Sequence, residues 1–226
     1  MKILAINGSH RKGRNTARML EAVLEEARSL GAETELLELS DYNIKPCRAC
    51  NHCLRAIECS IQDDDIKLIT DKMLIADAIV LGSPVYFFNV TGLMKNFMDR
   101  TRWLHMCRNV LYGKVGAAVT HAGLRNGGQE FTQMILERYL ASHGMIVVDS
   151  RDQESGIYNY GPTGTLFERL EGSRVIWKKG VEEDLLALHE CRTLGKNIVR
   201  QVQLLEASSI RRGPVVANTP SSPFSC

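Results

Sequence analysis

The sequence carries almost no net charge and no long apolar run, and each absence excludes a class of function. Its 28 Lys and Arg residues nearly balance 26 Asp and Glu residues, which gives a formal net charge of +2. A nearly balanced charge offers no electrostatic reason to expect nucleic acid as a partner, so we expect none. No apolar run approaches the ~20 residues of a membrane-spanning helix, so we expect no membrane association.

The start of the chain also lacks a secretory signal. The opening residues, MKILAINGSH, contain an apolar stretch that is too short for a signal peptide and that breaks into Gly-Ser. We therefore expect a cytoplasmic protein, in which thiols stay reduced and disulfides are the least expected use of its cysteines. With 226 residues, the chain is long enough to bury the core of one domain with an appendage.

Hydrophobic patterning predicts strands that alternate with helices. Short buried strands are expected at 2–7, 33–39, 77–84, 114–121 and 145–149. Helices are expected near 17–30, 63–73, 91–104 and 129–142, with the three aspartates 63–65 serving only to open the second of them. This alternation is typical of a parallel sheet with helices on both faces, whose ligands bind at the carboxyl ends of the strands.

The alternation stops after the fifth strand. Residues 150–180 are rich in Gly and Tyr, and we interpret them as an insertion or lid, or as irregular surface. A last helix is expected over about 181–205. Residues 1–207 then form one domain, and residues 208–226, which have Pro and Ser but no periodicity, form a flexible tail.

Three polar loops follow the first, third and fourth predicted strands. GSHRKGRNT (8–16) lacks the signatures of a nucleoside-triphosphate loop and of a dinucleotide fold, and its helix start suits a single phosphate. SPVYFFNVTG (83–92) carries aromatic residues that either seal the core or border a flat ring. THAGLRNGGQE (120–130) has glycines that permit close approach of a planar ligand, and His121 either contacts that ligand or is a hydrogen-bonded structural residue.

Four of the seven cysteines lie within thirteen residues, at Cys47, Cys50, Cys53 and Cys59. Their spacing, C-x2-C-x2-C-x5-C, allows four thiolates to surround one 4Fe–4S cluster. Zinc also accepts four thiolates, and His52 offers a further zinc ligand, but structural zinc sites more often pair two C-x2-C units across a longer gap. Packed thiols without a metal are the third interpretation. We favour the cluster.

Together, GSHRKGRNT, SPVYFFNVTGLMKNFMDR, THAGLRNGGQE and the CRACNHCLRAIEC that precedes DDD resemble the iron–sulfur flavoprotein branch of the flavodoxin-like NAD(P)H-dependent FMN reductases. The resemblance covers about the first 145 residues, with the motifs in family order. It implies a flavodoxin-like, doubly wound α/β fold with a five-stranded parallel sheet in the order 2-1-3-4-5. A cysteine-rich loop (44–62) would follow the second strand, and a C-terminal helical extension would end the domain.

The resemblance also implies the site residues. The FMN phosphate would be bound by Ser9, Arg11, Asn15 and Thr16. The isoalloxazine ring would be bordered on one side by Pro84, Val85, Tyr86, Phe87, Asn89 and Val90, and on the other by Thr120, His121, Gly123 and Gly128. The metal ligands would be Cys47, Cys50, Cys53 and Cys59. No catalytic acid–base residue is implied, because hydride transfer from a nicotinamide requires stacking and approach distance rather than a proton relay.

We therefore expect an FMN-dependent oxidoreductase that passes electrons between a 4Fe–4S cluster and FMN. NAD(P)H is the expected electron donor, and a redox protein such as a ferredoxin, or a small-molecule acceptor, is the expected partner. The family's oligomers imply a homodimer or homotetramer in which the cluster of one subunit faces the flavin of another. One alternative is a cluster-free NAD(P)H:FMN or quinone reductase, and another, of a different class, is a zinc-stabilised binding module.

Overall fold

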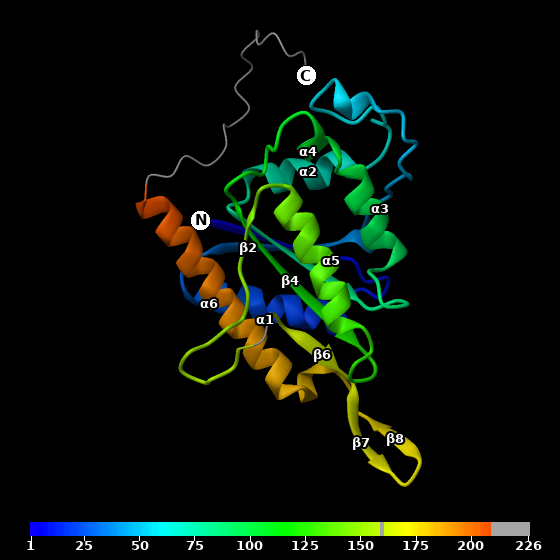
Figure 1. Ribbon diagram of the computed structural model, residues 1–226, viewed down its shortest axis with the longest axis vertical. Coiled ribbons are helices and arrows are strands. Elements are labelled where there is room, and N and C mark those ends of the chain that lie inside the picture. Colours follow the sequence, from blue (N-terminus) through cyan, green and yellow to red (C-terminus); the bar gives the residue numbers. More distant parts are fainter. Residues whose placement is uncertain (159–160, 209–226) are drawn as a thin grey trace.

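A parallel sheet with helices on both faces organises the computed structural model (Figure 1), which describes residues 1–158 and 161–208. Its main strands lie in the order β2-β1-β3-β4-β5 and all pair in parallel. Their bounds are β1 (Lys2–Asn7), β2 (Glu33–Glu38), β3 (Ala78–Pro84), β4 (Val115–Ala122) and β5 (Ile146–Val147). The predicted strand order is confirmed. It places the topological switch point between β1 and β3, where the connections leave in opposite directions.

A sixth strand, which the sequence pattern does not indicate, extends the β4 edge of the sheet. β5 pairs only with the start of β4, and β6 (Thr163–Thr165) pairs with its end, where Thr120 lies opposite Thr163. Two short strands therefore share the place beside β4. The predicted strand 145–149 is reduced to two residues because the chain leaves this edge after Val148, whose N–H still donates to Gly116 O at 2.9 Å, and returns at Pro162, whose oxygen accepts from Thr120 N at 3.1 Å.

Two layers of helices cover the sheet. α1 (Asn15–Ser29) and α6 (Leu185–Ala207) enclose one apolar cluster against one face, and α2 (Ile66–Ile75), α3 (Gly92–Arg100) and α5 (Gln129–Ser142) enclose another against the opposite face. The single helix predicted over 91–104 is two helices, since α3 ends at Arg100 and the short α4 (Trp103–Met106) follows. No described helix combines the length and apolarity that crossing a bilayer requires.

An antiparallel hairpin occupies the end of the predicted insertion 150–180. It consists of β7 (Phe167–Glu171) and β8 (Arg174–Trp177), and Figure 1 shows it (yellow) extending from the end of the molecule far from the cysteine loop (cyan). Its base is held to the sheet, because Leu166 N donates to Gly123 O at 3.0 Å. The predicted tail, 208–226, lies outside the described residues except for Ser208.

Helices α1 and α6 pack most closely at Gly195. A Cβ atom on this residue would lie 2.5 Å from the carbonyl oxygen of Val23 and 3.1 Å from Cβ of Glu26. A backbone oxygen cannot rotate away as the end of a flexible side chain can, so the absence of a side chain at Gly195 permits this approach.

We predict that Gly195→Ala lowers the free energy of unfolding by about 1–3 kcal/mol, the usual cost of inserting a methyl group into a packed contact. Gly92→Ala is the matched control, because it is also helical and its added Cβ would meet nothing within 4 Å. Urea unfolding followed by circular dichroism compares the two. Equal midpoints for the two variants would show that the helices do not depend on this contact.

Candidate functional site

The loops after β1 and β3 are joined at the carboxyl edge of the sheet, beside the switch point. Gly8 N donates to Gly82 O at 2.8 Å, and the Thr91 hydroxyl donates to Gly8 O at 2.6 Å. The rings of His10 and Tyr86 lie 6.1 Å apart between centroids. The first two loops predicted from the sequence therefore form one surface.

The loop after β4 closes the same surface from the other side. A Cβ on Gly128 would lie 2.7 Å from Cδ1 of Phe88, so the second and third loops touch. Asn15 Nδ2 lies 3.2 Å from Nε2 of His121, which joins the start of α1 to the end of β4. All three predicted loops thus meet at one edge, as parallel strands require.

A buried polar network holds the first loop in shape. Ser9 is 5% exposed; its N–H donates to Asn7 Oδ1 at 3.0 Å, and its hydroxyl accepts from Arg11 N at 3.1 Å. Glu38, at the end of β2, accepts from Asn7 Nδ2 at 2.6 Å and from Gly13 N at 3.0 Å. Asn7 and Glu38 support this candidate site and are absent from the residues predicted from the sequence, although a polar residue at the end of each of two neighbouring strands is a usable signal.

The N-cap residue of α1 does not cap the helix with its side chain. Arg14 occupies the N-cap position in extended conformation and makes no side-chain capping hydrogen bond, whereas Thr91 caps α3 by accepting from Met94 N at 3.0 Å. The first N–H groups of α1 are therefore free of any cap from Arg14 and carry the positive end of the helix dipole. Thr16 is 2% exposed, and the Arg11 side chain is exposed to solvent nearby in sequence.

The second loop contains a strained turn. Tyr86 N donates to Asn89 O at 2.8 Å and Asn89 N returns a bond to Tyr86 O at 3.0 Å, while Phe87 and Phe88 between them have φ values of +50° and +59°. Two consecutive bulky residues in the left-handed region are costly, and such strain concentrates at functional sites. The turn leaves the N–H groups of Phe87 and Phe88 outside its own hydrogen bonds and presents both rings, 101% and 62% exposed.

The remaining second-loop residues serve the scaffold more than the surface. Val90 is 5% exposed in the apolar cluster and donates its N–H to Asn89 Oδ1 at 2.8 Å. Pro84 is buried at the end of β3, and Val85 N donates to His121 O at 2.8 Å. The part of this predicted set that faces outward is therefore Tyr86 to Asn89, including Phe88, which the sequence reasoning omitted.

The third loop is shaped by a buried glutamine. Gln129 Oε1 accepts from Gly127 N at 2.7 Å, and its Nε2 donates to Leu124 O at 2.8 Å. Thr120 is fully buried and donates its hydroxyl to Gln129 O at 3.1 Å, so it lies beneath the edge rather than on it. Gly123 faces the hairpin, where a Cβ would be 3.6 Å from Trp177 Cζ3.

His121 is buried and neutral. It is 5% exposed, and burial, assisted by the positive charge of Arg11, lowers its pKa to about 4. An uncharged ring at pH 7 can accept or donate one hydrogen bond at the edge without adding charge to it.

The four clustered cysteines line one small pocket, together with Arg48, Arg100, Arg102 and other residues of the loop and of α3. All four are free thiols in the structure. Ala49 and Asn51, on either side of Cys50, have φ values of +51° and +58°, and these turns bring the successive cysteines toward the same pocket. The Ser60 hydroxyl, 3.0 Å from Cys50 Sγ, holds the pKa of that thiol below its ordinary value, while burial raises the pKa of Cys53.

Among the described residues, no three His, Cys, Asp or Glu side chains are already grouped around a point that could hold a metal ion. The donor set nevertheless fits an iron–sulfur cluster, since four free thiols share one pocket. His52 is paired with Glu58, its Nε2 lying 3.2 Å from Oε1. The loop has little regular structure besides a short turn at His52–Leu54, so the thiols are not held by helix or strand.

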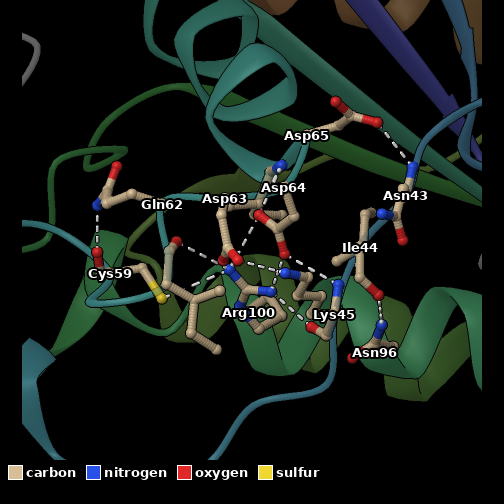
Figure 2. Close-up of polar contacts among 12 residues, drawn as sticks. Asn43, Ile44, Lys45, Cys59, Gln62, Asp63, Asp64, Asp65, Asn96 and Arg100 are labelled. Atoms are coloured by element: carbon tan, nitrogen blue, oxygen red, sulfur yellow. Dashed lines mark hydrogen bonds and ion pairs between the residues drawn. The ribbon is translucent and has the colours of Figure 1, made fainter.

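The prediction that the aspartates only start a helix is incomplete. Asp65 is the N-cap residue of α2, which begins at Ile66, and Asp64 Oδ1 accepts from Ile66 N at 3.3 Å. The carboxylate of Asp64 is also buried against the guanidinium of Arg100 (Figure 2), at the end of α3. α3 therefore connects the two candidate sites: Thr91 caps it beside the aromatic turn, and Arg100 ends it in the cysteine pocket.

The chain matches the family model for NADPH-dependent FMN reductase over residues 1–152. It is 43% identical over 199 residues to an iron–sulfur flavoprotein of Archaeoglobus fulgidus, covering 88% of this chain and 94% of that protein. It is 37% identical over 206 residues to iron–sulfur flavoprotein MJ1083 of Methanocaldococcus jannaschii, covering 91% and 100%. An iron–sulfur flavoprotein of Methanosarcina thermophila is 41% identical over 157 residues, covering 70% and 82%.

Solved structures agree on the fold. A flavodoxin from the domain Archaea has a TM-score of 0.56 at 21% identity, over 90% of this chain and 99% of that one. A flavodoxin, WrbA-like protein from Agrobacterium tumefaciens has a TM-score of 0.57 at 18% identity, over 90% and 97%. These likenesses confirm a flavodoxin-like fold. The chain therefore belongs to the NADPH-dependent FMN reductase family, in its iron–sulfur flavoprotein branch, and is a flavin-dependent oxidoreductase.

Proposed function

We propose that this FMN-dependent oxidoreductase passes electrons between FMN at the three-loop edge and a 4Fe–4S cluster in the cysteine pocket. The observation that carries the proposal is that α3 has one end at each site. Nine helical residues span only ~13 Å along the helix axis. Bound FMN supplies hydride chemistry with NAD(P)H and single-electron chemistry, and a cluster accepts one electron at a time.

The first loop is proposed to bind the FMN phosphate. The uncapped N–H groups at Asn15 and Thr16 and the Arg11 side chain offer donors and positive charge, as phosphate sites at helix starts do. Ser9 and the Asn7–Glu38 network orient this loop by fixing its backbone. The carboxylate of Glu38 accepts hydrogen bonds from Asn7 and from the loop at Gly13, so both of its oxygens have protein donors without a phosphate.

The second and third loops are proposed to hold the isoalloxazine ring. Tyr86 and Phe87 supply apolar faces, and the N–H groups of the Phe87–Phe88 turn are placed to donate to the ring edge. Gly128 allows Phe88 to approach closely, and Gly123 and His121 close the other side. An apolar wall and a few fixed donors suit a ligand that must be oriented rather than protonated.

Cys47, Cys50, Cys53 and Cys59 are proposed as the cluster ligands. Arg48 and Arg102 of the pocket offset part of the negative charge that four thiolates bring, whereas the charge of Arg100 is balanced by Asp64. A redox protein such as a ferredoxin, or a small-molecule acceptor, is the proposed partner, because Cys47 and Cys50 are exposed and electrons can leave there.

We further propose a cytoplasmic homo-oligomer. Leu185, Leu186 and Phe131 are 77%, 53% and 58% exposed, and large apolar side chains left at the surface favour contact with a second copy. Reduced thiols in the cysteine loop suit the cytoplasm.

Arg11→Gln tests the phosphate assignment. We expect FMN affinity to fall roughly 10- to 100-fold, because a hydrogen bond to a charged group is worth ~1.5–3 kcal/mol. Lys12→Gln is the matched control, since the neighbouring Lys12 is paired with Asp41. Titration of flavin-free protein with FMN, followed by flavin fluorescence, measures both. Equal affinities for the two variants would show that Arg11 does not bind the phosphate.

The cysteine assignment is tested by changing each of the four cysteines singly to Ser. After anaerobic reconstitution we expect each variant to lose iron and sulfide while keeping FMN, because removing one thiolate opens the cluster. His52→Ala is the control and should keep its iron. Iron, zinc and flavin are counted per chain with the visible spectrum. One zinc per chain that is lost with His52 would favour the zinc-stabilised module, and flavin without iron in the wild-type protein would favour the cluster-free reductase.

A further inference from the structure

The guanidinium of Arg100 is the centre of the cysteine pocket's polar network (Figure 2), although its side chain comes from α3. Arg100 is 1% exposed. Its Nη1 donates to Lys45 O at 2.5 Å and to the carboxylate of Asp64. Its Nη2 donates to Asp64 Oδ1 at 3.2 Å, to Ile61 O at 3.3 Å and to Cys59 Sγ at 3.6 Å.

Asp64 fixes the direction of this guanidinium. Its carboxylate is fully buried, pairs with both terminal nitrogens of Arg100, and accepts from Lys45 N at 2.9 Å and Ile66 N at 3.3 Å. A buried ion pair contributes little net stability compared with apolar residues of similar size, so its presence calls for another role. The planar fork of Arg meets the carboxylate with both terminal nitrogens, and the two N–H groups of Nη2 are shared among Asp64 Oδ1, Ile61 O and Cys59 Sγ.

The pair also holds together both ends of the cysteine loop. Lys45 precedes the first cysteine and Ile61 follows the last, and backbone oxygens of both accept from Arg100. The residue therefore fixes the loop ends and one ligand sulfur at once. Arg102, which lines the same pocket, is different: it is partly exposed and donates to Asn51 Oδ1 at 3.0 Å.

We infer that Arg100, aimed by Asp64, is a positioning residue that donates a hydrogen bond to the Cys59 thiolate and raises the reduction potential of the cluster proposed above. A donor to a ligand sulfur stabilises the more negative, reduced state more than the oxidised state. The ion pair has no net charge, so this effect is local to Cys59 rather than a general effect of positive charge. The inference rests on the proposed cluster.

The test uses full-length protein reconstituted anaerobically, with the cluster potential read from a redox titration monitored by electron paramagnetic resonance. The double variant Arg100→Met with Asp64→Asn removes the donor without leaving a buried carboxylate unpaired. We expect it to retain iron and to show a more negative potential than the wild-type protein. Arg102→Gln removes a cation from the same pocket and should leave the potential closer to that of the wild type.

Arg100→Lys separates the hydrogen bond from the charge and serves if the double variant does not fold. Its single nitrogen is expected to stay with Asp64 and leave Cys59, so the potential should again become more negative. A wild-type potential in Arg100→Lys, an equal shift in Arg102→Gln, or loss of iron from Arg100→Lys would overturn the inference, while the proposal that the wild-type protein holds a cluster would stand. A wild-type protein without iron would overturn the proposed function itself.

Discussion

The buried contact between Arg100 and Asp64 is the constraint on which the arrangement of the two sites depends. Polar contacts from α3 fix where the cysteine loop lies: Arg100 with Lys45 O and Ile61 O, and Asn96 Nδ2 with Ile44 O at 2.6 Å. α3 is itself packed on the sheet through Met94 and Phe97. The position of the cysteine loop is therefore set by the core, through α3. A loop with little secondary structure is thereby held in a defined place.

A similar arrangement holds the loop after β1. There a buried carboxylate, Glu38, reaches from the end of β2 to Asn7 at the end of β1 and to Gly13 in the loop that follows. In both loops the acidic residue accepts hydrogen bonds from protein donors. Other groups of the same loops are therefore the ones available to a ligand. The scaffold therefore shapes both loops by internal polar bonds. The start of α1 has no side-chain cap from Arg14, and the N–H groups of Phe87 and Phe88 lie outside the hydrogen bonds of their turn.

The local features of the fold could be predicted from the sequence, and the features that depend on distant partners could not. α5 begins and ends where its amphipathic spacing indicates, at Gln129 and Ser142. β6 could not be predicted, because the residues Thr-Gly-Thr form a strand only by pairing with the end of β4. The sequence places Asp64 at a helix start, where it does accept from Ile66 N, but its ion pair with Arg100, 36 residues away, depends on the fold.

The same distinction applies to the candidate site. Loop motifs identified the three loops and four cysteines, but not which side chains of each loop face outward: Thr120 and Val90 are buried, whereas Phe88 is 62% exposed.

Backbone strain points to the same loops independently of any motif. In the described part of the chain, the non-glycine residues with positive φ are Ala49, Asn51, Phe87, Phe88 and Asn126. All five lie in the cysteine loop, the aromatic turn or the loop after β4, and none lies in the loops that merely connect helices to strands. Alanine and phenylalanine are costly in this region, whereas asparagine adopts it readily. Strain of this kind concentrates at functional sites, so its occurrence in these loops agrees with the binding sites proposed above.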